Sequence, residues 1–267
     1  MAKPWRPGLR VYLMGEVCLV LGDRVVTADQ LPGRQGRLTA ALLLSERSQP
    51  TPRDQLAEVL WPDTPPQHFD VALSAIASKL RMILERLGLG RNALSTASGC
   101  YRIVLPERTW IDVEAAMEGV HLAEGALLAG RPADAYGHAV VAAAILRRPF
   151  LPGIEGAWVE GRREVLRTAH LRALDCLAQI HEWNGEHPLA LRAAGEAVEI
   201  EPYRESGHRR LMHLHDEAGD RAEALRVYTR LAELLERDLA TEPATETRAL
   251  RDSLADPSTK SRKVVKH

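Results

Sequence analysis

Polar residues in the first third of the chain have the types and the spacing needed to read double-stranded DNA. They fall on one side of a helix expected over residues 68–87, and they are Ser74, Ser78, Lys79 and Arg81. Short hydroxyl side chains can approach base edges closely, and Arg or Lys can reach a guanine or a phosphate. Taken alone, the pattern also fits the solvated face of an ordinary amphipathic helix. The elements predicted on either side of this helix are therefore needed to distinguish DNA binding from a solvated face.

Apart from DNA binding, the histidines, cysteines and carboxylates of the chain could indicate metal binding or catalysis. The loosely grouped candidates are Cys176, His181 and His187, followed by His208, His213 and His215. Their spacing matches no zinc motif, and the cysteine stands alone. The glycines of 88–90 follow a helix and lack the strand-to-helix setting of a phosphate-binding loop. We therefore expect no catalytic residue, no metal site, no cofactor and no enzymatic activity.

An apolar stripe determines which side of helix 68–87 is buried. Its members recur at spacings of three and four, and they are Phe69, Leu73, Ile76, Leu80, Leu84 and Leu87. The opposite side carries the four polar residues together with Ala75, Met82 and Arg86. Gly88 and Gly90 are expected to stop the helix. The polar residues are thus predicted to face away from the core.

The segments before this helix predict a small antiparallel sheet and two short helices. Residues 9–26 are rich in strand formers and contain a Gly-Asp turn. A helix is expected over about 34–47, with Arg34 and Arg37 at its start, where they can reach a DNA backbone. Thr51 is expected to cap the next helix, which ends near Trp61 because three prolines follow.

After helix 68–87, residues 94–105 predict a hairpin that turns at Ser98-Gly99. Two short helices, a longer helix and a hairpin, in this order, are the parts of a winged helix. Arg102 would lie in the wing, where it can enter the minor groove or bind phosphate. Tyr101, beside it, can be a DNA contact or a core residue.

Charge is unevenly distributed in a chain of 267 residues with a formal net charge of −1. Residues 1–106 carry net +4, residues 107–259 carry net −9, and the last eight residues are basic. A basic module joined to an acidic one suits a DNA reader followed by a protein-facing domain. Three scattered cysteines, the lack of a signal peptide and the lack of a membrane-spanning run predict a cytoplasmic protein.

The C-terminal half contains an internal repeat. Residues 185–191 and 219–225 are similar and lie 34 positions apart, which is the tetratricopeptide period. A third copy at 130–135 lies 55 positions upstream of the first, so a longer helix or an insertion must intervene. Such helix pairs stack on one another and present a groove.

With these motifs in view, residues 9–254 resemble the Streptomyces antibiotic regulatory protein (SARP) family, in which an OmpR-type winged helix precedes a bacterial transcriptional activation domain. The motifs include Leu60-Trp61-Pro62-Asp63, Ser78-Lys79-Leu80-Arg81, Gly99-Cys100-Tyr101-Arg102, Ile111-Asp112, Gly219-Asp220-Arg221-Ala222-Glu223-Ala224-Leu225 and Glu242-Pro243. Departures are Met82 and Ala75, where the family more often has basic or polar groups, and Cys100, which interrupts Gly-Tyr-Arg.

The resemblance implies an activator that binds direct repeats in promoter DNA as a side-by-side dimer and recruits RNA polymerase holoenzyme. Carried over by position, Ser78, Lys79 and Arg81 lie on the recognition helix. The loop 62–68 would face polymerase, and its polar members are Asp63, Thr64, Gln67 and His68. No receiver, nucleotide-binding or phosphopeptide-binding domain is recognised, so a signal is expected to act through the helical domain, for example as an unknown small-molecule effector, or through the level of the protein.

We therefore predict a mainly α protein with a winged helix-turn-helix domain over 1–106. A tetratricopeptide-like all-α domain follows over 107–254, and a basic, disordered tail over 255–267. The predicted function is sequence-specific transcriptional activation. The alternative is a ligand- or protein-sensing repeat protein whose winged helix binds DNA weakly or serves as an interaction module.

Overall fold

A computed structural model describes residues 8–256 of the protein. The tail predicted for 255–267 lies, beyond Asp256, outside these residues. The chain forms two compact units. The first contains the residues up to Glu118 together with Ala144–Thr168, and the second contains Gly119–Ala143 and the residues from Ala169 onward. The winged helix and the helical repeat predicted from the sequence are both present.

The first unit begins with the sheet expected over 9–26. Its antiparallel strands are β1 (Leu9–Tyr12), β2 (Cys18–Leu21) and β3 (Arg24–Thr27). Gly22, with φ +64°, makes the tight turn between β2 and β3. A further strand, β7 (Thr109–Ile111), pairs in parallel with β1 and completes the order β3-β2-β1-β7. The sequence did not predict β7, because its partner lies a hundred residues away.

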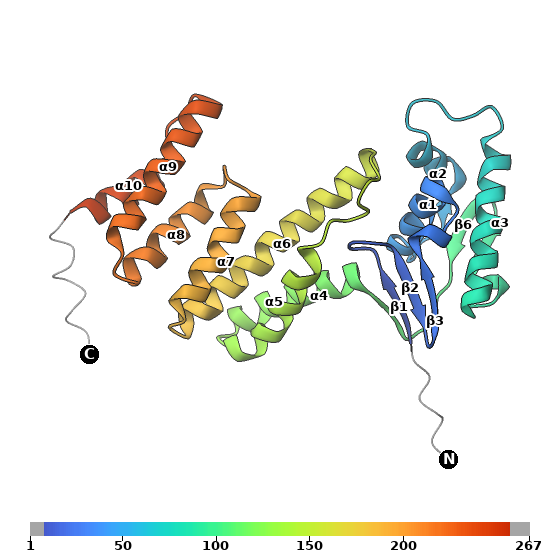
Figure 1. The fold of residues 1–267 in the computed structure, drawn as a ribbon, viewed down its shortest axis with the longest axis horizontal. Coiled ribbons are helices and arrows are strands. Elements are labelled where there is room, and N and C mark those ends of the chain that lie inside the picture. Colours follow the sequence, from blue (N-terminus) through green and yellow to red (C-terminus); the bar gives the residue numbers. More distant parts are fainter. Residues whose placement is uncertain (1–7, 257–267) are drawn as a thin grey trace, which may run out of the picture. The chain divides into compact units, whose positions relative to one another are not determined.

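The helices and the wing of the first unit follow the predicted order (Figure 1). The elements are η1 (Ala28–Gln30), α1 (Gly33–Ser45), β4 (Thr51–Pro52), α2 (Arg53–Leu60), α3 (Phe69–Leu87), η2 (Arg91–Ala93), β5 (Leu94–Ala97) and β6 (Cys100–Ile103). The wing strands form a second sheet of order β4-β6-β5. The predicted cap at Thr51 is wrong. Thr51 is buried in β4 and pairs with Tyr101, so α2 begins at Arg53 without a side-chain cap.

The core of this unit lies between α3 and the elements packed against it. The predicted stripe of α3 is buried at Leu73, Ile76, Leu80, Leu84 and Leu87, and α3 contacts α1 and α2. The helix ends at Gly88, which has φ +105° and donates its N–H to the carbonyls of Glu85 and Leu84. The amphipathic pattern therefore sets the exposed side of α3, as expected.

Residues that follow the winged helix in sequence complete the same unit. The buried Asp112 accepts hydrogen bonds from the backbone N–H groups of Leu13 and Met14, at 2.9 and 2.9 Å, and of Val113 at 2.8 Å. Burial raises the pKa of this carboxyl group, and the three N–H donors oppose that shift. Farther along the chain, Phe150 forms a β-bridge with Met14. The domain boundary at residue 106 stays a prediction, and residues beyond it belong to the first compact unit.

The second unit is made of helices. From the N-terminal side, the helices of this half of the chain are α4 (Asp112–Leu128), α5 (Pro132–Leu146), α6 (Ala157–Trp183), α7 (His187–Ile200), α8 (Glu205–Glu217), α9 (Arg221–Leu239) and α10 (Thr245–Ala255). Gly130, Gly185 and Gly219 have φ of +70°, +73° and +82°, and each marks the turn of one sequence repeat. The longer helix expected between the copies at 130–135 and 185–191 is the 27-residue α6.

Small buried residues bring the repeat helices together. Ala178, Ala190, Ala194 and Leu214 form one cluster, and Met212, Ala224, Val227 and Leu254 form another. Alanine at these places lets neighbouring helices approach closely, as in other stacked helical repeats.

No helix in the described part of the chain is both long and apolar enough to cross a membrane.

Candidate nucleic-acid interface

The side of α3 opposite its buried stripe is exposed and carries half of the predicted contact residues. Ser74, Ser78, Lys79 and Arg86 are exposed, and 51% of Met82 is accessible. In a winged helix this is the side that enters the major groove. The structure thus brings five of the ten predicted DNA contacts onto one surface.

Arg81 is predicted from the sequence to lie among the exposed polar residues of this side, but in the structure its side chain is bonded to the wing. Its side chain is only partly exposed, and its Nε donates to the Leu94 carbonyl at 2.8 Å. Its Nη2 donates to Thr96 Oγ1 at 2.5 Å. Arg81 therefore joins α3 to wing strand β5, and its DNA contact stays a prediction.

The wing separates the two residues predicted there. Side chains alternate along β6, so Tyr101 and Ile103 point inward while Arg102 points to solvent. Only 7% of Tyr101 is accessible, because it packs into the core of the unit. Arg102 therefore lies on the surface and Tyr101 in the core, and the DNA contact predicted for each stays a prediction.

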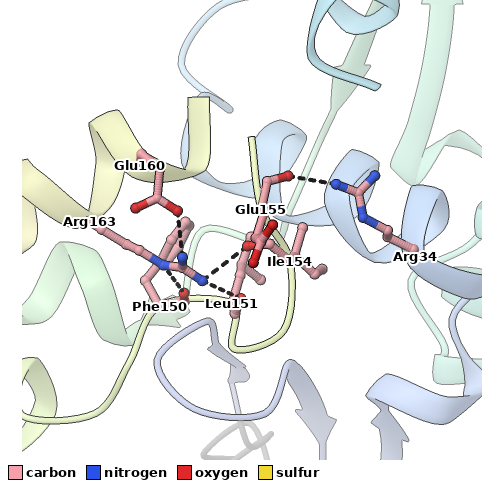
Figure 2. A network of polar contacts seen from close by, with 7 residues as sticks. All are labelled: Arg34, Phe150, Leu151, Ile154, Glu155, Glu160 and Arg163. Carbon is pink, nitrogen blue, oxygen red and sulfur yellow. Dashed lines mark hydrogen bonds and ion pairs between the residues drawn. The ribbon is translucent and has the colours of Figure 1, made fainter. Parts of the chain in front are cut away.

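The two arginines at the start of α1 have neighbours that the sequence did not reveal. Arg34 is exposed, and its Nη2 donates a hydrogen bond of 2.6 Å to the backbone carbonyl of Glu155 (Figure 2). Arg37 is partly exposed, and its Nε is buried without a hydrogen-bond partner among the described residues. Arg34 is thus engaged by the segment between α5 and α6.

That segment is organised around Arg163, a residue that sequence reasoning missed. Its guanidinium donates to the carbonyls of Phe150, Leu151 and Ile154 at 3.0, 2.8 and 3.0 Å (Figure 2). It also contacts Glu160 at 2.6 Å. Carbonyl groups in an irregular loop need donors when they leave water, and one arginine supplies three of them. No local sequence pattern signals such a role.

The loop predicted to face polymerase joins α2 to α3. Its polar members Asp63, Thr64, Gln67 and His68 are all exposed. The loop turns into α3 through the hydrogen bond from Phe69 N–H to the Pro66 carbonyl, at 3.0 Å. The loop is thus available for contact from solvent.

Two histidines and the one cysteine of the second unit have roles that the structure explains. His181 Nδ1 lies 2.6 Å from Glu186, and His208 Nε2 lies 2.8 Å from the Pro202 carbonyl. Burial raises the pKa of the Cys176 thiol to about 11, so it stays protonated at neutral pH. No group of three or more potential metal ligands occurs among residues 8–256.

A winged helix with an exposed recognition-helix side, followed by tetratricopeptide-like helices, is the architecture of a transcriptional regulator. The family model described as "Bacterial transcriptional activator domain" matches residues 111–255, more than half of the chain. The chain therefore belongs to this family, and the resemblance to SARP-family regulators predicted from the sequence is confirmed.

Individual relatives agree with this assignment. Regulatory protein AfsR of Streptomyces griseus is 26% identical over 246 residues, which are 92% of this chain and 24% of AfsR. Transcriptional regulatory protein MoaR1 of Mycobacterium tuberculosis is 26% identical over 216 residues, covering 80% and 70% of the two chains. The present chain thus spans about a quarter of the length of AfsR.

A solved structure has the same fold over almost the entire chain. Mycobacterium tuberculosis EmbR, in complex with a low-affinity phosphopeptide, is 25% identical with a TM-score of 0.79. The match covers 95% of this chain and 67% of that chain.

Proposed function

We propose that this protein is a sequence-specific DNA-binding transcriptional activator. It binds direct repeats in promoter DNA as a dimer, and it recruits RNA polymerase holoenzyme. The observation that carries the proposal is the exposed side of α3, because a winged helix reads DNA by placing this side in the major groove. Family membership supports the link to transcription.

The exposed cations support contact with the DNA backbone. Lys79 and Arg86 on α3 and Arg102 on the wing are exposed. None of the three forms an ion pair within residues 8–256. An unpaired surface cation is ready to replace the counterions of a phosphate. These three residues are therefore assigned to phosphate or groove contacts. Ser74 and Ser78, on the same exposed side of α3, are assigned to contacts with base edges.

A second candidate function is ligand sensing by the helical unit, and a recess in that unit favours it. The recess has a volume of about 380 Å³, and its lining includes Glu124, Leu127, Leu128, Arg172, Cys176 and Arg210. Arg172 is already paired with Glu124, Nε to Oε1 at 2.7 Å, and Arg210 donates to the Asp175 carbonyl at 3.2 Å. A small-molecule effector would have to compete with these contacts, so we keep sensing as an addition to DNA binding.

The proposal is tested by selecting bound duplexes from random DNA and measuring their dissociation constants over a salt series. Lys79→Ala and Arg86→Ala should each weaken binding by about 5- to 150-fold, the equivalent of about 1–3 kcal/mol. Each substitution should also make the plot of log binding constant against log salt concentration less steep, by about 0.9, the value expected for the loss of one phosphate contact. Arg131→Ala, which removes an exposed cation from the helical unit, is the control. No selected sequence, or an equal effect of all three variants, would overturn the proposal.

A further inference from the structure

The middle of the exposed side of α3 contains a row of residues without charge. At 100° per residue, Val71, Ala75, Ser78 and Met82 lie within about 60° of one another, directly opposite the buried stripe. All four are exposed, with 69% of Val71 and 51% of Met82 accessible. This row, defined by these four residues, is therefore the part of α3 that would lie deepest in a groove.

The charged residues of α3 flank the row. Lys79 and Arg86 lie along one edge, where they can reach phosphates. On the other edge, the acidic groups are neutralised by neighbours: Asp70 pairs with Arg53 at 3.3 Å, and Glu85 with Arg91 at 3.0 Å. Arg81 is directed to the wing by its bonds to β5.

The residue types in the row determine which base it can recognise. Guanine is read by Arg or Lys, adenine by Asn or Gln, and cytosine by an acidic side chain. None of these types occurs in the row, whose members are aliphatic, a thioether and a hydroxyl. An apolar side chain in the major groove has one complementary group, the C5 methyl of thymine.

Resting on the proposed DNA-binding function, we infer that Val71 and Met82 select thymine by contact with its methyl group, and that Ala75 gives the backbone room for a close approach. With a rise of about 1.5 Å per residue, Val71 and Met82 are separated by about 16 Å along the helix. That distance is long enough to span several base pairs along the major groove. The two residues therefore read different thymines, near the two ends of one half-site.

Duplex DNA suits this surface better than a protein partner does. The row is one residue wide, and cations of Lys79 and Arg86 follow its edge. Such a narrow strip beside positive charge complements a groove whose floor carries methyl groups and whose rim carries phosphates. If the row instead contacts a protein, the alanine variants described below should keep the full thymine preference.

The test replaces each thymine of a selected duplex with deoxyuridine, which removes the methyl group and keeps all base-pair hydrogen bonds. We expect at least two positions at which the full-length protein binds about three- to tenfold more weakly. Val71→Ala should lose the thymine preference at one of them and Met82→Ala at the other. Because both side chains are exposed, neither change should lower the thermal unfolding temperature.

Lys79→Ala is the matched control. It should weaken binding to the thymine and uracil duplexes equally, so that the ratio of the two dissociation constants is that of the unaltered protein. If no duplex is selected at all, the proposed DNA-reading function itself fails. If a duplex is selected but uracil is tolerated everywhere, or if the alanine variants keep the full thymine preference, DNA reading stands and this inference is overturned.

Discussion

The guanidinium of Arg34 donates a hydrogen bond of 2.6 Å to the backbone carbonyl of Glu155, across 121 residues of sequence (Figure 2). This contact joins the start of α1 to the segment 147–156. The same segment reaches the first sheet, where the Gly15 N–H donates to the Pro149 carbonyl at 2.7 Å. Residues from within the activator-domain match thus form part of the scaffold around the winged helix.

Arg163 is expected to hold this segment in place. Arg163→Met keeps much of the aliphatic stem and removes the donors to the carbonyls of Phe150, Leu151 and Ile154. Each hydrogen bond from a charged donor typically contributes about 1.5–3 kcal/mol, so the free energy of unfolding should fall by at least that amount. Chemical denaturation gives this energy, and hydrogen exchange should accelerate over 149–156.

Arg167→Met is the control for Arg163. Arg167 lies one helical turn farther along α6 and pairs with Glu164 at the surface. An exposed pair of this kind contributes about 1 kcal/mol or less. Equal losses in the two variants would contradict the role given to Arg163.

The stability of the first unit is expected to depend on the carboxylate of Asp112. Asp112→Asn places an amide NH2 where the backbone N–H groups of Leu13 and Met14 need an acceptor. A buried donor without an acceptor typically costs about 1–3 kcal/mol. The variant should therefore unfold at a lower denaturant concentration. Asp134→Asn, in the exposed first turn of α5, should change stability by less than about 1 kcal/mol, and a similar loss in both variants would contradict the prediction.

The exposed loop between α2 and α3 is expected to contribute to activation and not to DNA binding. Asp63→Ala combined with His68→Ala should lower transcription in a reconstituted polymerase assay while the dissociation constant for promoter DNA is unchanged. Both residues are exposed and lie outside the row and its cationic edge, so DNA contacts should persist. Normal transcription by the double variant would place the polymerase contact elsewhere. Thr64→Ala serves as a milder change in the same loop.

Local patterns were sufficient to predict most elements of the winged helix. The spacing of Leu73, Ile76, Leu80 and Leu84 defined the buried side of α3, and Ser98-Gly99 marked the turn of the wing. The 34-residue repeat indicated the helix pairs of the second unit. In each case the signal and the structure lie within a few tens of residues of each other.

Long-range pairing explains what the sequence could not predict. Thr51 has the sequence context of a helix cap. In the structure it lies in β4 and pairs with Tyr101 of β6, fifty residues away. The bond of Arg81 to Leu94 and the docking of Glu155 on Arg34 likewise depend on the assembled fold. A residue type and its spacing show what a side chain can do. The fold determines which partner it meets.

His208 predicts a pH dependence of stability in the helical unit. Its Nε2–H donates to the Pro202 carbonyl, and its Nδ1 is buried without a partner among the described residues. Burial therefore lowers the pKa of His208 from its ordinary value of 6.5. Below that pH the unfolded chain binds a proton that the folded chain resists, so folding weakens as pH falls.

His208→Gln should reduce this loss of stability between pH 7.5 and pH 5, measured by denaturation at each pH. His213→Gln, on the same helix but exposed, should leave the pH dependence of the unaltered protein in place. If His208→Gln retains the full pH dependence, the buried imidazole is not its source.

The predicted end of the winged-helix domain can be tested by comparing fragments 1–106 and 1–118. The longer fragment keeps β7, which pairs with β1, and Asp112, which binds the strand end at Leu13. It also keeps Glu114, whose carboxylate accepts two hydrogen bonds from Arg47, at 2.8 and 2.7 Å. Without these residues β1 becomes an exposed edge strand, which favours aggregation.

Fragment 1–118 should therefore unfold cooperatively at a temperature several degrees above that of fragment 1–106, and it should stay monomeric at higher concentration. Both fragments contain α3 and the wing, so both should bind the selected duplex when folded. Binding should be weaker than for the full chain and without cooperativity on paired sites, because the helical unit is missing. Equal stability and solubility of the two fragments would show that the domain ends at residue 106 and that β7 contributes little to it.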